Sequence, residues 1–195
     1  MSHSKSAALP LEFRTLIEAF ATAEVAESQR WILTLMRKQG LAVIQMLWRM
    51  LGAEADVLDA YQSAICQLTG QGERSITTNP AGYFYRCAMN AGIEILRARQ
   101  QRNEHSPAVA AFQRQRYEHP SAACIVDQRE TVENLRQAIG RLPQQLRSVI
   151  ILHDLAEISY ARVARILNIG VNTARLYRCQ AVARLGDLMA EEARG

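Results

Sequence analysis

The sequence predicts an all-α protein of two small helical domains joined by a flexible linker, the C-terminal one a helix-turn-helix. Apolar residues make up 49% of the chain and aromatics only 6%. Ala, Leu, Ile and Val carry most of the apolar content, which favours helix over sheet. Apolar residues recur at helical spacing, and no segment shows strand-like alternation. A polar stretch containing Pro107 and Pro120 separates the two periodic parts.

The N-terminal helices are predicted from this periodicity. One apolar stripe belongs to a helix that should end near Gly52: Ile44, Leu47, Trp48 and Leu51. The next elements are expected to be a helix over 54–68, a Gly-, Ser-, Thr- and Asn-rich loop over 69–80 and a helix over 81–99. The predicted organisation is an N-terminal helical extension (1–28), a first domain (29–103), a linker (104–127) and a second domain (128–195).

The second domain is expected to contain helices over 128–139, 143–153, 159–167 and 171–190. Pro143 fits the first position of its helix, where the missing N–H costs nothing.

The basic residues are almost all arginine. The net charge is +4 and the pI about 9.1, and of the 23 basic residues only Lys5 and Lys38 are lysines, which leaves 21 arginines. Arginine makes planar bidentate contacts with phosphate and with guanine edges, so this bias suits a nucleic-acid partner. A coding bias towards arginine is the alternative explanation.

The cysteines and histidines do not predict a metal centre. The four cysteines have no CxxC spacing, which favours reduced thiols in a cytoplasm, and pairing of His119 with Cys124 on a metal is disfavoured. No signal peptide or long apolar span is found, so we expect a soluble cytoplasmic protein without direct membrane insertion.

An enzyme is not expected, and neither is a cofactor. The sequence has no Gly-rich phosphate loop, nucleophile elbow or spaced metal ligands. His153 and Asp154 are adjacent on a predicted helix, so their side chains splay apart.

Residues 159–178 have the pattern of a helix-turn-helix. Apolar or small residues stand where the two helices must touch: Val163, Ala164, Leu167, Ile169, Ala174 and Tyr177. Asn168 stands at the turn and tolerates left-handed φ. Between 159 and 186 there is no acidic residue, but there are five arginines, as expected of a phosphate-facing surface: Arg162, Arg165, Arg175, Arg178 and Arg184. The alternative is an ordinary helical hairpin in a core.

The second helix of this motif is expected to enter the major groove of DNA. The candidate duplex-binding residues are Asn172, Thr173, Arg175, Leu176, Arg178 and Cys179. Arg175 suits a guanine or a phosphate, Asn172 suits an adenine, and Leu176 can touch only a thymine methyl group.

The helix after residue 79 has two different faces. Its inward face is predicted to hold Phe84, Ala88, Ala91 and Ile95. The other face and the preceding loop are candidates for binding a single strand, because aromatics stack on bases while arginines hold phosphates: Thr78, Asn79, Tyr83, Arg86, Asn90 and Arg97. A solvated polar face over an aromatic core is the alternative.

Both parts of the chain resemble the sigma-70 family, specifically the short sigma factors of the extracytoplasmic function group, which retain only regions two and four. The family's region-four pattern, LP…R.V…L……SY.EIA..L..S..TV, is matched by Leu142, Pro143, Arg147, Val149, Leu152, Ser159, Tyr160, Val163, Ala164, Leu167 and Thr173. The A-E-D-V-V-Q-E-A-F helix of region two is matched by Ala53, Glu54, Val57, Asp59, Ala60 and Tyr61. Its W-L-Y-R-I-A-R-N…D.LR helix is matched by Tyr85, Arg86, Ala88, Asn90, Glu94, Leu96 and Arg97.

The resemblance covers about residues 30–102 and 128–190, and it implies an alternative sigma factor that binds core RNA polymerase and directs promoter recognition and DNA melting. Region two would bind the clamp helices of the polymerase largest subunit through Glu54, Asp56, Asp59 and Gln62. It would also hold the −10 non-template strand. Region four would bind the β flap and the −35 element. The resemblance also implies an anti-sigma factor as a partner.

Some positions depart from the family pattern. Arg162 replaces the usual Glu, Gly170 the usual capping Ser, and Tyr83 the usual Trp. Leu176, Tyr177 and Arg178 replace the common S-R-L, which changes the residues available to read a −35 element. Two alternatives stay open: a dimeric helix-turn-helix regulator, and a sigma-like interaction protein without promoter recognition.

Overall fold

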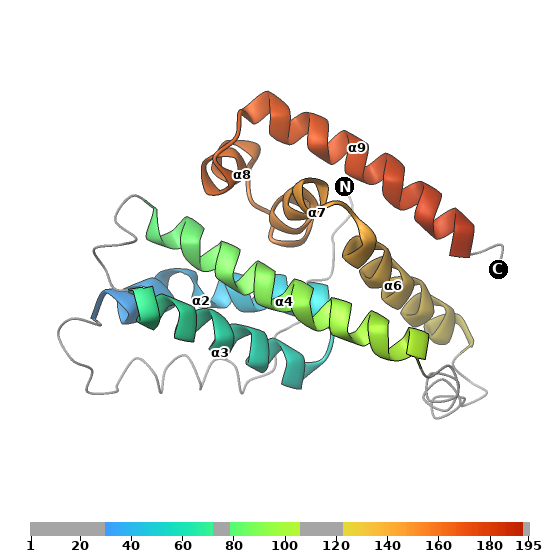
Figure 1. Ribbon diagram of the computed structural model, residues 1–195, viewed down its shortest axis with the longest axis horizontal. Coiled ribbons are helices and arrows are strands. Elements are labelled where there is room, and N and C mark those ends of the chain that lie inside the picture. Colours follow the sequence, from blue (N-terminus) through green and yellow to red (C-terminus); the bar gives the residue numbers. More distant parts are fainter. Residues whose placement is uncertain (1–29, 72–78, 106–122, 193–195) are drawn as a thin grey trace.

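The computed structural model describes residues 30–71, 79–105 and 123–192, and its regular structure within these ranges is entirely helical (Figure 1). In chain order the elements are α2 (Arg30–Leu51), α3 (Glu54–Gln71), α4 (Pro80–His105), α6 (Ala123–Arg141), α7 (Gln144–Ile150), the π-helix η3 (Ile151–Leu155), α8 (Tyr160–Leu167) and α9 (Val171–Glu192). The predicted all-α class with a C-terminal helix-turn-helix is confirmed. The extension 1–28, Thr78 and His119 lie outside the described residues.

Helices α2, α3 and α4 contact one another and form what we call the front lobe. The Tyr61 ring meets the Phe84 ring edge-on in its core, with ring centroids 5.8 Å apart. Gly92 allows α4 to approach α2 closely, because a Cβ at this position would collide with the Met50 side chain. Burial of apolar side chains from all three helices stabilises this lobe.

The front-lobe helices are longer than predicted. Helix α2 ends at Leu51 as expected, and Gly52 adopts φ +71 while its N–H donates to the Trp48 carbonyl oxygen at 2.9 Å. Helix α4 extends to His105, so residues 104–105 are helical rather than part of the predicted linker. Gln, Arg and Glu in this segment are good helix formers, and no Gly or Pro interrupts them before Pro107.

Helices α6 to α9, with η3, form what we call the rear lobe. Helix α6 starts at Ala123, so residues 123–127 also belong to a helix and not to the predicted linker. The expectation that Pro143 is the first helical residue is wrong. Its ψ of 143° makes it the N-cap, although its φ of −53° suits either position. Its carbonyl oxygen accepts from the Arg147 N–H at 3.0 Å.

The predicted helix over 143–153 is divided in the structure. Helix α7 ends at Ile150, and the chain continues as the π-helix Ile151–Leu155, where the Ala156 N–H donates to the Ile151 carbonyl oxygen at 2.9 Å. His153 and Asp154 lie in this wider turn, and both contact residues of the helix-turn-helix, as described below.

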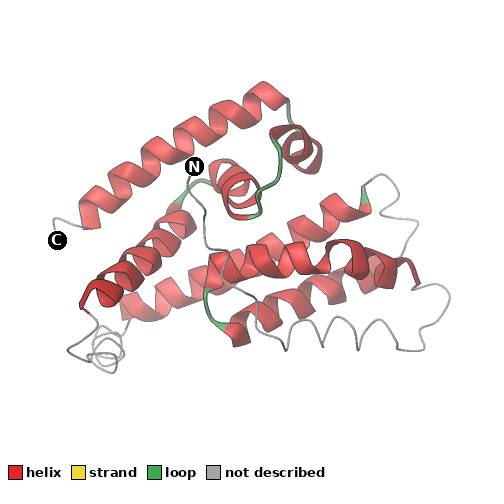
Figure 2. Cartoon of the chain, turned by 180° about the vertical axis from the view of Figure 1, so that it is seen from behind, coloured by secondary structure: helices red, strands yellow, loops and turns green. Residues whose placement is uncertain are grey.

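The two lobes pack against each other along what we call the seam (Figures 1 and 2). Helix α4 contacts α6 and α8, and α2 contacts η3, so one continuous buried cluster includes residues of both lobes. Of the predicted inward residues of α4, Phe84, Ala88 and Ala91 are buried and Ile95 is half-buried. A second group on this helix is also buried: Tyr85, Met89, Ile93 and Leu96. Helix α4 therefore has two buried sides, whereas its sequence pattern predicted one.

Candidate nucleic-acid interface

The turn between α8 and α9 has the geometry expected of a helix-turn-helix. Asn168 is the C-cap of α8 and adopts the left-handed conformation, with φ 55° and ψ 50°, as predicted. The Ile169 N–H donates to the Ala164 carbonyl oxygen at 3.0 Å, and Ala164 and Ala174 are buried where the two helices meet. Gly170 precedes α9, and its carbonyl oxygen accepts from the Ala174 N–H at 3.0 Å.

The exposed face of α9 carries most of the predicted duplex-binding residues. Asn172, Arg175, Leu176 and Cys179 are exposed, and Thr173 is half-buried. The Arg175 guanidinium lies over the Tyr160 ring, 5.7 Å from its centroid, and its Nη1 is 3.5 Å from the Asn172 Oδ1. A guanidinium held over a ring retains free donors at its edge, which suits contact with a guanine or a phosphate. Leu176, with 55% of its surface exposed, adds an apolar contact to this face.

Arg178, also predicted to bind DNA, has a protein partner. Its Nη2 and Nε donate to the Asp154 carboxylate at 2.8 to 3.1 Å, which ties α9 to η3. Hydrogen bonding to Asp154 raises the pKa of the Arg178 guanidinium. Nearby, the His153 ring stacks on the Tyr160 ring, with centroids 3.9 Å apart. Arg178 therefore stabilises the structure of the helix-turn-helix, and a contact with DNA would require its ion pair with Asp154 to break.

The predicted strand-binding face lies on α4. Arg86, Asn90 and Arg97 are exposed, and the Arg86 guanidinium lies 5.7 Å from the centroid of the half-buried Tyr83 ring. Asn79 has a structural role at the start of α4, because its Oδ1 accepts from the Gly82 N–H at 2.9 Å. Single-strand binding by the Asn79 side chain would therefore compete with this capping bond.

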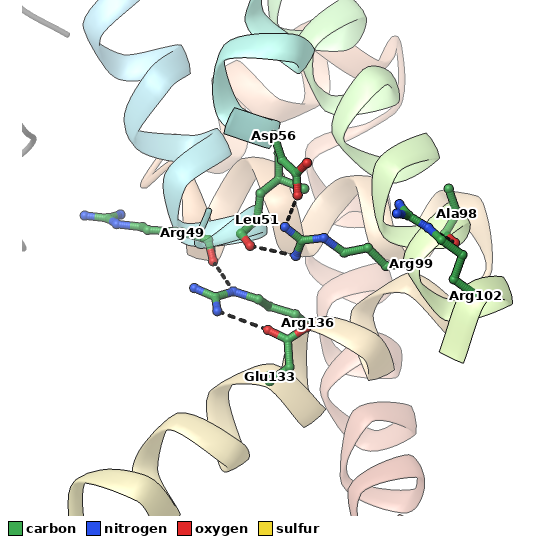
Figure 3. Close-up of polar contacts among 8 residues, drawn as sticks. All are labelled: Arg49, Leu51, Asp56, Ala98, Arg99, Arg102, Glu133 and Arg136. Atoms are coloured by element: carbon green, nitrogen blue, oxygen red, sulfur yellow. Dashed lines mark hydrogen bonds and ion pairs between the residues drawn. The ribbon is translucent and has the colours of Figure 1, made fainter. Parts of the chain in front are cut away.

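The residues predicted to bind polymerase lie on α3 but have different surroundings. Asp59 and Gln62 are exposed on the outward face, and Glu54 is half-buried. Asp56 forms an ion pair with Arg99 of α4, which also donates to the Leu51 carbonyl oxygen at 2.9 Å (Figure 3). Asp56 therefore holds two front-lobe helices together, and only part of the predicted group is presented to a partner.

Several arginines serve as internal hydrogen-bond donors, which the sequence patterns did not predict. Arg49, Arg99, Arg136 and Arg147 each donate to a backbone carbonyl oxygen. Arg147 is 2% exposed, and burial together with the charge of Arg97 lowers the pKa of its guanidinium. The only sequence signals were the helix ends themselves, which leave carbonyl groups without intrahelical partners. The arginine content is therefore explained in part by the fold.

Within residues 30–71, 79–105 and 123–192, no group of three or more His, Cys, Asp or Glu side chains could hold a metal ion. In the same ranges, none of the helices combines the length and apolarity needed to cross a membrane.

Comparison with known proteins identifies the rear lobe and the fold. The family described as "Sigma-70, region 4" matches residues 132–185, a segment that includes the whole helix-turn-helix. Among solved structures, the fold of this chain is similar to that of CnrH, with a TM-score of 0.50 and 18% sequence identity. That structure is titled "Structure of CnrH in complex with the cytosolic domain of CnrY". The similarity covers 92% of this chain and 97% of CnrH. No curated protein matches the sequence significantly.

These findings agree with the resemblance inferred from the motifs. The rear lobe is a sigma-70 region 4 domain, and the fold across nearly the whole chain is that of CnrH. The segment 132–185 therefore belongs to sigma-70 region 4, and the chain as a whole shares the fold of CnrH.

Proposed function

We propose that this chain is a sigma factor that divides promoter recognition between its lobes, with α9 reading the −35 duplex and α4 holding the −10 non-template strand. The observation that carries the proposal is the exposed face of α9 within the segment that matches region 4. The front lobe, with expected bounds 29–103, would act as region two. The rear lobe, with expected bounds 128–195, would act as region four.

The duplex contact is supported by the residue types on α9. Asn172 and Arg175 lie in the first two turns of the helix, the part that enters the major groove in this motif. Arg175 can donate two bonds to a guanine, and Asn172 can pair with an adenine edge. Leu176 and Cys179 add apolar contacts, so we expect a −35 element in which a thymine methyl group faces Leu176. Arg165 is exposed on α8 and suits a contact with a phosphate, whereas Arg184, nine residues after Arg175 on α9, lies about 180° around the helix from it.

The strand contact is supported by the pairing of Arg86 with Tyr83. An arginine near the edge of an aromatic ring can hold a phosphate while the ring stacks on the adjacent base. Asn90 and Arg97 extend this face along the same side of α4. Extruding a base from the duplex costs a few kcal/mol, which such contacts would offset.

The remaining partners follow from the family resemblance and the exposed face of α3. Asp59 and Gln62 are available to the polymerase clamp helices, with Glu54 at the edge, and the rear lobe would bind the β flap. Core RNA polymerase acts in the cytoplasm, so we expect this chain to act there as well. CnrH is described in complex with the cytosolic domain of CnrY, and we propose an anti-sigma factor for this chain as well.

The test is in vitro transcription of fragmented genomic DNA from the native organism, with core polymerase alone and with core plus this chain. Sequencing of RNA 5′ ends should reveal start sites that depend on the chain. Arg175→Ala should reduce their use, whereas Arg184→Ala, more than two turns further along α9, is the matched control.

Other outcomes would favour the rival functions. Retardation of promoter duplex without polymerase, by a dimeric chain, would indicate a helix-turn-helix regulator. Stable binding to core polymerase without any new start site would indicate an interaction protein. Failure to bind core polymerase would contradict the proposal.

A further inference from the structure

The π-helix η3 lies against the helix-turn-helix at the place where α9 carries its two neighbouring arginines. His153 of η3 stacks on Tyr160, the first residue of α8. The next residue of η3, Asp154, pairs with Arg178 of α9. Turns of π-helix are rare in proteins and are frequently found at functional sites. The contacts of η3 therefore bear on how α9 presents its side chains to DNA.

The His153 ring is held from two directions. Its Nδ1 donates to the Ile158 carbonyl oxygen at 2.8 Å, and its plane lies at 25° to the plane of the Tyr160 ring. Ile158 is buried, and its N–H donates to the Leu152 carbonyl oxygen at 3.0 Å, so the acceptor of the His153 bond is itself fixed to η3. The His153 ring is therefore a firm support for the Tyr160 ring.

The Tyr160 ring in turn lies beneath the arginine that we propose reads the duplex. The Arg175 guanidinium is over this ring, with its Cζ 5.7 Å from the ring centroid. The electron-rich face of an aromatic ring attracts a guanidinium and so favours one placement of this long side chain. The Arg175 Nη1 also lies 3.5 Å from the Asn172 Oδ1, one turn earlier on α9. The guanidinium is thus directed towards the N-terminal part of α9, which enters the major groove in this motif.

The orientation of Arg175 matters more for a base than for a phosphate. Bidentate pairing with guanine requires two N–H groups to align with O6 and N7 at the same time. A phosphate can be approached from many directions, and its contacts carry no sequence information. An exposed arginine loses rotamer freedom when it binds, and this loss is smaller when the guanidinium is already oriented.

Arg178, one turn after Arg175, is held in a different way. Its guanidinium is bound to the Asp154 carboxylate. Hydrogen bonding to Asp154 is the main cause that raises the pKa of Arg178, and the proximity of Tyr160 adds to it, so this ring lies beside both arginines. Through two successive side chains, η3 restrains Arg178 and supports the ring beneath Arg175.

We infer that Tyr160, supported by His153, is a positioning residue for base reading: its ring orients the Arg175 guanidinium for bidentate pairing with a guanine of the −35 element. The inference rests on the proposed function, in which Arg175 contacts that element. Tyr160 acts through Arg175 and needs no contact with the base. Loss of the ring should therefore reduce discrimination between bases, while Arg175 can still bind a phosphate.

The test compares guanine with 7-deazaguanine, which lacks the N7 acceptor, in the −35 element of a promoter that depends on this chain. Fluorescence anisotropy of the holoenzyme with each duplex gives two dissociation constants, and their ratio measures discrimination. The guanine read by Arg175 is the one whose replacement weakens binding by the wild-type chain and not by Arg175→Ala. A partly unfolded population would weaken binding to both duplexes equally, so lost stability alone leaves the ratio unchanged.

The variants separate the ring from the rest of the Tyr160 side chain. Tyr160→Leu should lower the ratio about two- to fivefold, the range expected for one exposed contact between a cation and a ring. Tyr160→Phe keeps the ring and should keep the ratio. His153→Ala should lower the ratio in the same direction and His153→Phe should restore it, which tests the support independently of any substitution at Tyr160. Binding to a scrambled duplex and its dependence on salt should stay the same in all four variants.

Tyr177→Leu is the matched control. Tyr177 is a half-buried aromatic residue of α9 in the same motif, and it is not part of the stack beneath Arg175. Its replacement should lower Tm without changing the ratio. The double variant Tyr160→Leu/Arg175→Ala should discriminate no less than Arg175→Ala alone, because the ring acts only through this arginine.

The outcomes distinguish this inference from the proposed function. An unchanged ratio in Tyr160→Leu and His153→Ala would overturn the positioning role, as would an equal fall in Tyr160→Phe or in Tyr177→Leu. A wild-type ratio near one at every guanine would also overturn it, because no guanine would then be read through N7. If core polymerase gained no start site from the wild-type chain, the proposed function itself would be contradicted.

Discussion

The pairing of Arg178 with Asp154 predicts that Arg178 stabilises the helix-turn-helix, whereas Arg175 reads DNA. The perturbations are Arg178→Ala, Arg175→Ala and Asp154→Ala in the full chain. Both side chains of the pair are about one third exposed, at 38% and 31%. Three donor–acceptor distances of 2.8 to 3.1 Å indicate a well-formed contact between one guanidinium and both carboxylate oxygens.

The magnitude follows from this exposure. Solvent screening limits an exposed ion pair to about 0.2–1 kcal/mol, and bidentate geometry places this pair near the upper end. For a chain of this size, a loss of about 0.5–1 kcal/mol lowers Tm by about 1–4 °C. Arg178→Ala and Asp154→Ala should each show this shift, and the double variant should lose little more than either alone, since both remove the same interaction.

The affinity for DNA should depend on Arg175 and hardly on Arg178, the reverse of their effects on stability. Loss of a bidentate contact with a base costs about 1–3 kcal/mol, so Arg175→Ala should weaken −35 binding by the holoenzyme by about 5- to 150-fold. Arg178→Ala should change it by less than about threefold, by the same conversion. Asp154→Ala frees the Arg178 guanidinium for a phosphate, so sequence-independent binding should increase and its salt slope should steepen by about one.

The assays are thermal unfolding by circular dichroism and fluorescence anisotropy with labelled promoter and scrambled duplexes over a salt series. The reasoning would be refuted if Arg178→Ala weakened specific binding as much as Arg175→Ala while Tm stayed the same. In that case the contact with Asp154 would not persist in the bound state, and Arg178 would be a reading residue.

Three further predictions concern stability, measured by urea and thermal denaturation. Burial without a hydrogen-bond partner within the described part of the chain raises the pKa of Tyr61 to about 12, so the free energy of unfolding should fall as the pH rises from about 10 to 12. Tyr61→Phe should abolish this fall and be neutral or stabilising at pH 7, and an equal pH dependence in the variant would contradict the assignment. Gly186→Ala, in open space on α9, should stabilise by about 0.5–1 kcal/mol. Gly92→Ala should gain less, because the added methyl group displaces the end of the Met50 side chain and crowds Leu47, and an equal gain at both sites would show that packing at Gly92 is not tight. The free energy of unfolding of Arg147→Met should stay within about 1 kcal/mol of wild type, because a side chain of similar length keeps the seam filled, whereas Arg147→Ala should lose about 2–4 kcal/mol. A larger loss in the methionine variant would mean that the charge of Arg147 is itself needed.

The helix-turn-helix could be predicted residue by residue because its determinants are local. Asn168 sits where the chain must turn, and a residue that tolerates left-handed φ is required there whatever the rest of the molecule does. The same holds for Gly52 at the end of α2. The apolar stripe of each helix likewise identified its inward side, as at Phe84 and Ala88. The fold class followed from such local signals, and Ala88 is also among the residues that carry the family resemblance.

The partners of the arginines depended on the tertiary structure. Nothing near Arg178 in the sequence distinguishes it from Arg175, yet one pairs with an acid 24 residues away and the other lies exposed over Tyr160. Arg49 is likewise paired with a loop more than 100 residues distant. Arginine side chains are long and have several donors, so which carbonyl or carboxylate they reach depends on how whole helices pack.

The sequence by itself determined two helical lobes, the turn that shapes the DNA-binding motif and the residues that could face DNA. Only the tertiary structure decided that α4 is buried on two sides, that the lobes close on each other and that the Tyr160 ring lies between His153 and Arg175 in a chain of contacts. Hydrophobic periodicity indicates which residues of a helix are buried. The pattern is the same whether those residues pack within their own lobe or against the other lobe, so it could not predict the contact between the lobes. The seam depends on contacts between distant parts of the chain, which no local pattern records.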